Sequence, residues 1–478
     1  MKKEEIQMKK IISVSMSIVM LFQVCVFAFA DFNAPALTKP EWDSYYASLK
    51  DYNTLPMLCV GANESEVSLC WHADKDTAVA QVRIADNADM NGAKTFAGKT
   101  TESENDEQSV CRVTVTGLEE NSTYYYQWYT DNGWSESCKY ETKSFGNHKT
   151  LVIGDIQIGG QTESTEVQSQ NGYDWNSVLA EALSENPDVS FLLSAGDNTS
   201  TGKTAAEWQT LLMPEALRGL PLALAIGNHD KKGMMYNYYT NMPNEFYGNY
   251  FEGLDRDFWF RHGDVLYLVF DACSPAAADH MAMAKEAVEA NPDAKWRIGV
   301  MHQALFGPGY SVLDPETSIL LNAVFSPIFD SYDLDLVING HSHLQGRSHF
   351  IWESSVVGKA ESGKTYTDPR GTVYLNTNAI CDQNSFSASS HYSAYSFFEN
   401  DITTYTTLEF EDDTLVIETR RGDNSELLDS LTLKKTKEFK DNGILQKLHR
   451  FVYKFVEFLG IVYQKIDNIV VEIRGGHF

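Results

Sequence analysis

The clearest pattern in the chain is a short apolar run that ends abruptly in polar residues. Residues 221–226 are all apolar, and Gly-Asn-His-Asp follows them at 227–230. A run of this length between Pro and Gly is typical of a strand buried on both faces. Because ligands bind at the carboxyl ends of strands in open α/β sheets, we expect Asn228 and His229 to lie at a ligand-binding edge.

The same pattern occurs four more times. Each apolar run delivers Asp, Asn or His at its carboxyl end, in residues 151–155, 191–197, 298–302 and 336–343. One such strand end indicates little, since Asp is common in turns and a single His is often a satisfied structural residue. Five of them in one chain predict that their polar ends meet at one site.

Helical patterns separate these runs after residue 149. They cover residues 174–184, 205–217, 276–290 and 315–329. This alternation predicts an α/β (α+β) domain with a mainly parallel sheet and helices on its faces. Residues 258–270 break the alternation, because two strand-like runs flank a turn there and predict a hairpin. Strands return at 374–380 and 403–420, and we expect them to complete the second sheet of this domain.

The preceding segment has a different period. Short runs alternate between apolar and polar residues at 67–71, 78–84, 109–115 and 123–128, with turn residues between them. This spacing predicts a small all-β sandwich. It contains no grouping of acid, base or metal ligand in sequence, so we expect it to act as a spacer, a docking module or a wall of the cleft.

Residues 1–30 have the features of a secretory signal. Lys9 and Lys10 precede an apolar stretch at 11–29, and Ala28-Phe29-Ala30 matches a small-x-small cleavage site. The stretch also approaches membrane-spanning length, so an uncleaved anchor is the alternative. The cleavage site favours a secreted, extracellular or cell-surface protein.

The charge balance is strongly acidic. The chain has 38 basic and 66 acidic residues, a net charge of −28, and loss of the four Lys and two Glu in residues 1–30 would make it −30. A surface of this sign repels nucleic acid, so no nucleic-acid binding is expected. A long polyanionic substrate is also disfavoured, unless bound cations make the cleft locally positive.

Six cysteines follow the predicted signal. Four of them lie within the first 150 residues: Cys59, Cys70, Cys111 and Cys138. An exported chain permits disulfides among them, with three connectivities. Cys70 and Cys111 each lie in a strand-like run, which favours a cross-sheet or cross-strand bridge. Cys273 and Cys381 are expected to be buried, inert thiols.

The C-terminal segment, 435–478, has apolar residues at intervals of three and four, which predict an amphipathic helix. The stripe comprises Ile444, Leu448, Phe451, Phe455, Leu459, Val462, Ile466 and Ile469. No run in the segment reaches spanning length. Docking on a protein surface or self-association is favoured over adhesion to a membrane surface.

The polar strand ends together offer carboxylate and amide oxygens and imidazole nitrogens. They are Asp155, Gln157, Asp197, Asn228, His229, Asp230, His302, Gln303, His341 and His343. This mixture suits a pair of transition-metal ions, rather than a thiol-rich site or an all-oxygen calcium site. One Asp would have to bridge the ions. Two metals about 3.5 to 4 Å apart would hold a hydroxide between them and bind a phosphoryl oxygen.

This ordered series resembles the calcineurin-like metallophosphoesterases, and the preceding sandwich makes the chain most similar to their purple acid phosphatase branch. The resemblance spans residues 58–421 and implies a two-sheet sandwich flanked by helices, preceded by the smaller all-β domain. Residues 115–126 also resemble a corner of fibronectin type III domains. The implied division is a signal peptide at 1–30, an N-terminal segment at 31–57, a fibronectin type III-like or purple acid phosphatase N-terminal-like domain at 58–147, a metallophosphoesterase domain at 148–434 and the helix at 435–478.

The resemblance also implies a role for each polar end. Six residues would bind the metals: on one ion Asp155, Asp197 and His343, and on the other the bridging Asp197 with Asn228, His302 and His341. His229 would contact the phosphate or protonate the leaving group. Asp230 is grouped with His229 as a catalytic residue. We expect it to orient neighbouring groups by hydrogen bonding and not to bind metal.

Two positions depart from the family pattern. Many members have His two residues after the first Asp, where this chain has Gln157, a residue that could bind phosphate or solvent or ligate a metal weakly. Purple acid phosphatases have a phenolate Tyr three residues after the bridging Asp, and other members have an Asp there that orients the catalytic His. Here that position is Ser200, so the purple colour should be absent and iron, zinc or manganese could serve.

Two functions follow from the sequence. The first is a secreted phosphoesterase in which a hydroxide activated by two metals attacks phosphate esters of small molecules. The second is a catalytically silent surface binding protein on the same scaffold, which Gln157 and Ser200 favour. The sequence leaves open the leaving group, the preference for monoesters or diesters and the identity of the metals.

Overall fold

The computed structural model describes residues 36–49, 55–76, 78–103, 107–160, 164–247, 256–274, 276–306, 315–381, 395–399 and 402–436. The predicted signal peptide and the predicted C-terminal helix lie outside these residues. Among the helices that are described, none is long and apolar enough to cross a membrane.

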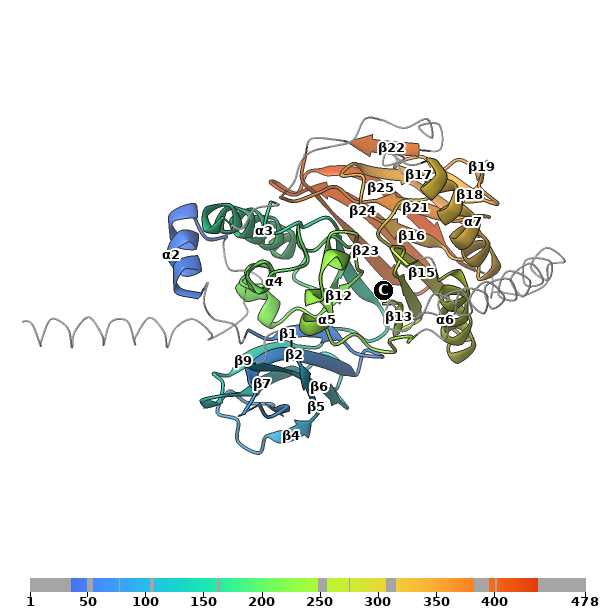
Figure 1. Ribbon diagram of the computed structural model, residues 1–478. Coiled ribbons are helices and arrows are strands. Elements are labelled where there is room, and N and C mark those ends of the chain that lie inside the picture. Colours follow the sequence, from blue (N-terminus) through green and yellow to red (C-terminus); the bar gives the residue numbers. More distant parts are fainter. Residues whose placement is uncertain are drawn as a thin grey trace, which may run out of the picture.

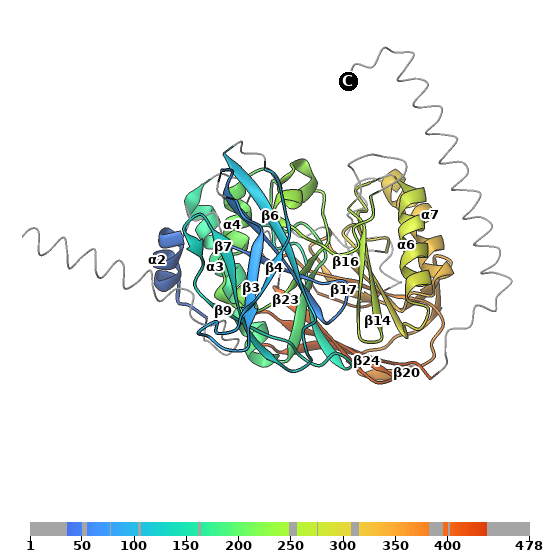
Figure 2. The ribbon, with the colours of Figure 1, turned by 90° about the horizontal axis from the view of Figure 1, so that it is seen from below.

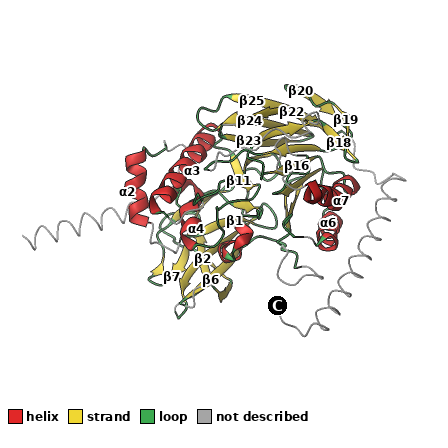
Figure 3. Ribbon diagram, turned by 45° about the horizontal axis from the view of Figure 1, so that its top comes forward, coloured by secondary structure: helices red, strands yellow, loops and turns green. Residues whose placement is uncertain are grey.

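Two sheets pack face to face in the larger part of the molecule. The first has the strand order β20-β25-β24-β23-β10-β11-β12-β1-β2-β6-β5, and the second has the order β13-β14-β15-β16-β21-β17-β22. Helices α2, α3 and α4 lie on one side of the strands, and α6 and α7 lie on the other (Figure 1, Figure 3). The two-sheet sandwich flanked by helices is therefore confirmed.

The first half of the larger part contains the parallel strands of the first sheet. Its elements are β10 (His148–Ile153), α3 (Thr165–Glu185), β11 (Val189–Ser194), α4 (Ala205–Leu211), η1 (Glu215–Arg218), β12 (Leu222–Leu224), η2 (Asp230–Lys232) and α5 (Met235–Tyr239). Helix α3 begins nine residues before the predicted start at residue 174. The helix predicted at 205–217 is interrupted, because residues that precede a proline such as Pro214 avoid the helical conformation.

The second sheet follows. Its elements are β13 (Phe258–His262), β14 (Val265–Phe270), α6 (Ala277–Ala290), β15 (Trp296–Met301), α7 (Pro315–Ser331), β16 (Leu336–Asn339), β17 (Gln345–Ser348), β21 (Val373–Asn376) and β22 (Tyr395–Glu399). Strands β13 and β14 pair through His262 and Val265, so the predicted hairpin is confirmed. Alternate residues of β14 divide between two cores: Tyr267 packs between the sheets and Leu268 packs beneath α6 and α7.

The last strands correct one prediction. They are β18 (Phe350–Trp352), β19 (Ser355–Gly358), β20 (Lys364–Thr367), β23 (Thr404–Glu411), β24 (Thr414–Arg421) and β25 (Leu427–Lys434). The run at 374–380 does enter the second sheet, but the run at 403–420 joins the first, where β23 pairs with β10. Strands β23 and β24 form a hairpin. This hairpin covers the edge of β10, which would otherwise expose unpaired backbone groups.

The N-terminal part is the predicted β sandwich, preceded by one helix. Its elements are α2 (Lys39–Leu49), β1 (Met57–Val60), β2 (Glu66–Asp74), β3 (Gln81–Ala85), β4 (Lys94–Ala97), β5 (Lys99–Glu102), β6 (Gln108–Thr116), β7 (Thr123–Thr130), β8 (Gly133–Trp134) and β9 (Cys138–Glu141). It lies on the side of the molecule that carries α3 and α4 (Figure 2). Its sheet continues into the first sheet through the parallel pair Cys59 and Leu222.

The favoured disulfide is wrong. None of the cysteines in the described residues is in a disulfide. Cys70 pairs across the ladder with Arg112, and Cys111 pairs with Trp71, so the two sulfurs point to opposite faces of the sheet. The sequence could not show this, because the facing depends on the register between β2 and β6.

Candidate metal centre

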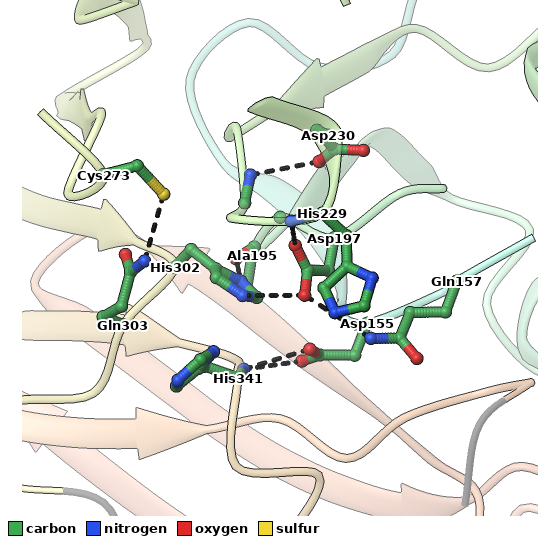
Figure 4. A network of polar contacts seen from close by, with 12 residues as sticks. Asp155, Gln157, Ala195, Asp197, His229, Asp230, Cys273, His302, Gln303 and His341 are labelled. Atoms are coloured by element: carbon green, nitrogen blue, oxygen red, sulfur yellow. Dashed lines mark hydrogen bonds and ion pairs between the residues drawn. The ribbon is translucent and has the colours of Figure 1, made fainter. Parts of the chain in front are cut away.

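The polar strand ends meet between the two sheets. Strands β10, β11 and β12 of the first sheet lead to Asp155, Asp197 and Asn228. Strands β15 and β16 of the second sheet lead to His302 and His341. The single parallel edge expected from the sequence is therefore two facing edges, one supplying mostly oxygen atoms and the other imidazoles (Figure 4).

Asp197 is the central carboxylate of this cluster. Its Oδ2 lies 3.1 Å from Nε2 of His302, and its Oδ1 accepts a 2.7 Å hydrogen bond from the backbone N–H of His229. Burial alone would raise the pKa of Asp197, but the charge of His302 and these hydrogen bonds lower it below its usual value. Asp197 is therefore held as a carboxylate between two neighbouring loops.

His302 is oriented by the backbone. Its Nδ1–H donates a 2.9 Å hydrogen bond to the carbonyl oxygen of Ala195, which leaves Nε2 to face Asp197. Burial alone would lower the pKa of His302, but the Asp197 carboxylate outweighs it and raises the pKa to about 9. A cation that bound at Nε2 would displace this proton.

Asp155 holds the loop of the second sheet. Both of its carboxylate oxygens accept hydrogen bonds from the backbone N–H of His341, at 3.1 and 2.9 Å. Its Oδ1 also lies 3.5 Å from Nε2 of His343. This places His343 beside Asp155, as the resemblance implied, while His341 forms a group with Asp197 and His302 whose potential ligand atoms all lie within 4.8 Å of one another.

Several predicted site residues have strained backbone. Positive φ angles occur at Asp155, Gln157, Asp197, His341 and His343, with values from 49° to 72°. Residues other than glycine adopt this region at a cost, and such strain concentrates at functional sites. The backbone conformation that directs these side chains toward the cluster therefore lowers the stability of the fold.

Glycines allow the loops to approach the carboxylates. A Cβ atom at Gly227 would lie 2.1 Å from Oδ1 of Asp197, and one at Gly340 would lie 2.4 Å from Oδ2 of Asp155. No side chain could be accommodated at these distances, so glycine is required at both positions.

Asn228 provides the clearest sign of a missing partner. Its Oδ1 is buried and accepts no hydrogen bond in the described structure. Buried amide oxygens are almost always paired, so this atom fits a cation better than a structural role. Carboxylates, one amide oxygen and imidazoles form a donor set that suits zinc, manganese or iron.

The backbone carbonyl of Ser200 orients His229. Nδ1–H of His229 donates to this oxygen at 2.5 Å, and Nζ of Lys232 lies 3.1 Å from the same nitrogen. The hydroxyl of Ser200 does not face His229 but donates a 2.8 Å hydrogen bond to the carbonyl oxygen of Gln157. The chain thus orients His229 through a backbone carbonyl, although it lacks the Asp that the family pattern places at this position.

Asp230 lies behind the cluster rather than in it (Figure 4). Its fully buried carboxylate accepts hydrogen bonds from the backbone N–H groups of Gly227, Asn198 and Thr199. Burial, with a smaller contribution from Asp197, raises the pKa of Asp230 to about 7. Its position supports the predicted orienting role, since it joins the loops after β11 and β12.

Two asparagines that the sequence analysis missed hold the histidine loops. Nδ2 of Asn339 donates to the carbonyl oxygens of Met301 and Gln303, on either side of His302. Nδ2 of Asn376 donates to the carbonyl oxygen of Leu344 at 2.7 Å, and also to the Ser342 hydroxyl. Both asparagines are the last residues of strands β16 and β21, and that position was the available signal.

Other polar residues near the site have structural contacts. The segment 236–241, which follows Gly-Asn-His-Asp, packs on the β sandwich: Nε of Arg112 donates to the Thr240 carbonyl oxygen at 2.9 Å, and Nδ2 of Asn241 donates to the Leu69 carbonyl oxygen. The amide of Gln303 donates to the thiol of Cys273 at 3.0 Å. Cys273 is only half-buried, and desolvation raises the pKa of its thiol to about 12. These contacts are structural.

The comparisons agree with this architecture. Residues 148–345 match the model of the calcineurin-like phosphoesterase family, and residues 56–142 match that of the purple acid phosphatase N-terminal domain. The chain therefore contains a calcineurin-like phosphoesterase domain, preceded by the N-terminal domain of purple acid phosphatases. The family depends on a dinuclear metal centre.

One solved structure shows the same fold at low sequence identity. Purple acid phosphatase PPD1 from yellow lupin (Lupinus luteus) seeds superposes with a TM-score of 0.66 at 14% identity, over 80% of this chain and 74% of that one. GAP50, the anchor in the inner membrane complex of Plasmodium, has a TM-score of 0.43 at 16% identity, over 64% of this chain and 95% of that one. No curated protein matches the sequence.

Proposed function

We propose that this protein hydrolyses phosphate esters with the help of two transition-metal ions. The observation that carries the proposal is the convergence of Asp155, Asp197, Asn228 and the histidines, with Oδ1 of Asn228 buried and unpaired. Leaving an amide oxygen buried without a partner costs about 1–3 kcal/mol. A cluster that served only the fold would gain nothing from that cost.

Each residue has a distinct task in this proposal. The ions, when bound, would supply Lewis-acid charge and lower the pKa of water. Asp155, Asp197, Asn228 and the histidines would hold them. Because Nδ1–H of His229 is engaged by the Ser200 carbonyl, Nε2 is the nitrogen left to exchange a proton with the leaving oxygen.

The loops are held before substrate arrives. Asp230 ties Gly227 to the loop that carries Asp197, and Asn339 fixes the backbone beside His302. A preorganised site does not have to reorder its dipoles during the reaction. This electrostatic preorganisation is the largest contribution to the rates of many enzymes. Small phosphate esters are the expected substrates, because the strongly acidic chain repels long polyanions.

The test is turnover of p-nitrophenyl phosphate and its bis ester by protein supplied with manganese, zinc or iron. We expect hydrolysis of at least one ester, and we expect Asn228→Ala to lower kcat/KM by about 100-fold or more. Asn132→Ala is the matched control, because Asn132 is exposed in the turn after β7. Absence of turnover with all three metals would favour the silent binding protein.

The same proposal places the protein outside the cell. Support comes from the small-x-small site at Ala28-Phe29-Ala30 after the apolar stretch. N-terminal sequencing of the exported protein should begin at Asp31. An intact N-terminus in a membrane fraction would support the uncleaved anchor instead.

A further inference from the structure

Gln157 lies among the candidate metal ligands. Its side chain is 2% exposed, and its Nε2 lies 3.2 Å from Nε2 of His343 and 3.4 Å from Oδ2 of Asp197. Oδ1 of Asp155 lies 3.5 Å from the same atom of His343. The end of the Gln157 side chain therefore contacts two of the residues expected at the first metal position, His343 and Asp197, and Figure 4 shows it beside Asp155 and Asp197.

The backbone of Gln157 is fixed on both sides. Its N–H donates to the carbonyl oxygen of Asp197 at 3.0 Å, and its own carbonyl accepts the Ser200 hydroxyl at 2.8 Å. Its φ angle is 50°, a conformation that glutamine rarely adopts. The backbone of Gln157 is therefore strained in the conformation that directs its side chain into the cluster. Such strain is typical of functional sites.

The distances of these three contacts suit neighbouring ligands of one ion. Nitrogen and oxygen ligands bound at about 2.0–2.2 Å to one ion lie roughly 3 to 3.5 Å from one another. The Gln157 nitrogen lies within hydrogen-bond distance of both His343 and Asp197, at 3.2 and 3.4 Å. Rotation of the carboxamide exchanges its nitrogen with its oxygen, and that oxygen is a hard, neutral metal ligand.

From this geometry we infer that the carboxamide of Gln157 is the fourth protein ligand of the metal position formed by Asp155, Asp197 and His343. The inference rests on the metal centre of the proposed function but not on hydrolysis. Because the added ligand is neutral, this position carries less negative charge than one with a phenolate. The position therefore selects a divalent ion over a trivalent one.

The experiment measures metal binding without substrate. Metal-free protein is titrated with Zn²⁺ and Mn²⁺ by calorimetry, and bound Mn²⁺ is examined by electron paramagnetic resonance. Wild type should bind two ions per chain and give the spectrum of a coupled pair. Gln157→Met, which keeps the size of the side chain, should bind its second ion at least about 10-fold more weakly and give a mononuclear spectrum.

Two further variants make the result specific. Gln157→His should bind Zn²⁺ at this position more tightly than wild type, since imidazole is a stronger ligand for it. Gln303→Met is the matched control: Gln303 is adjacent to His302, but its amide contacts Cys273, so both ions should bind as in wild type.

The outcomes separate this inference from the proposed hydrolysis. Two ions bound with wild-type affinity in Gln157→Met would overturn the ligand assignment, and so would a wild type that binds fewer than two ions. Wild type that binds two ions, loses one in Gln157→Met and hydrolyses no ester would leave the assignment standing and remove the enzymatic function.

Discussion

Buried and half-buried histidines lie in two regions of this molecule, and their surroundings differ. In the core between the sheets, Nε2 of His148 lies 2.9 Å from the Tyr267 hydroxyl, and Nε2 of His262 lies 3.2 Å from the Ser144 carbonyl oxygen. In the metal centre, His302 faces the Asp197 carboxylate and the neighbouring Asn228 oxygen is unpaired. Burial alone therefore does not identify a site; the partner of each donor atom does.

The electrostatics of the two regions differ in the same way. Burial lowers the pKa of His148, and it lowers the pKa of His262 to about 4, so both rings are neutral. Burial would do the same to His302, but Asp197 raises its pKa to about 9. The core pair consists of neutral, tilted rings whose centroids lie 4.3 Å apart, whereas the candidate metal centre brings carboxylates and imidazoles together.

The largest effect that separates the two regions should come from Asp197→Asn. Asp197 is the carboxylate grouped with His302 and His341. Its loss should lower kcat/KM by more than about 1000-fold and remove at least one ion per chain. Steady-state kinetics and metal analysis measure the two effects. His148→Phe is the control and should keep both ions and activity within about 3-fold. Equal losses in the two variants would contradict the distinction drawn here.

Another buried histidine, His280, tests whether a carboxylate partner is sufficient for a metal site. Nδ1 of His280 lies 2.6 Å from Oδ2 of Asp257, and both side chains are fully buried. Burial lowers the pKa of His280, but Asp257 outweighs it and raises the pKa to about 9. We expect Asp257→Asn to reduce the free energy of unfolding by about 3 kcal/mol, because it leaves a buried charge unpaired.

Chemical denaturation measures that loss, and metal analysis supplies the contrast. The Asp257→Asn protein should still bind two ions per chain where it is folded, since Asp257 is bonded to His280 and to the backbone N–H of Asp271. Loss of metal without loss of stability would place Asp257 in the metal centre instead of the core.

Acid should weaken the core pair. The pKa of His262 is lowered from 6.5 to about 4 on folding, and that of His148 is lowered as well, so between pH 6.5 and 4 the unfolded chain binds more protons than the folded chain. The contribution is fully present above pH 6.5 and is lost as the pH falls. Over this range, wild type should lose more stability than His148→Phe. Denaturation curves with the same pH dependence for both proteins would contradict this.

The smallest effect should come from Ser200→Ala. The Ser200 carbonyl, which orients His229, is unchanged in this variant, and only the hydroxyl bond to the Gln157 backbone is lost. Such a bond contributes about 1 kcal/mol, so we expect less than about 5-fold loss in kcat. A loss as large as that of a metal-ligand variant, seen in kinetics at saturating metal, would show that the hydroxyl itself acts in the reaction.

The sequence predicted the strand ends well because their signal is local. An apolar run followed by Gly-Asp or Gly-Asn-His specifies both the strand and the residue displayed at its end, as at Asp155, Asp197 and Asn228. Local periodicity was sufficient wherever one element alone decided the outcome.

Features that depend on pairing between distant strands could not be predicted. The opposite facing of Cys70 and Cys111 depends on ladder register, and the placement of β23 beside β10 depends on which edge is open. The orienting carbonyl of Ser200 was also missed, because every residue has such a group and only the loop conformation makes this one useful.

The pairing of β1 with β12 has a practical consequence. Strand β12 carries the loop with Asn228 and His229, and its outer neighbour belongs to the N-terminal sandwich. A fragment that began at residue 148 would leave β12 as a bare edge strand beside the catalytic loop, open to pairing with other chains. The phosphoesterase half is therefore expected to need its sandwich in order to remain soluble, and a cut made at the division that the sequence suggests would damage the half it was meant to isolate.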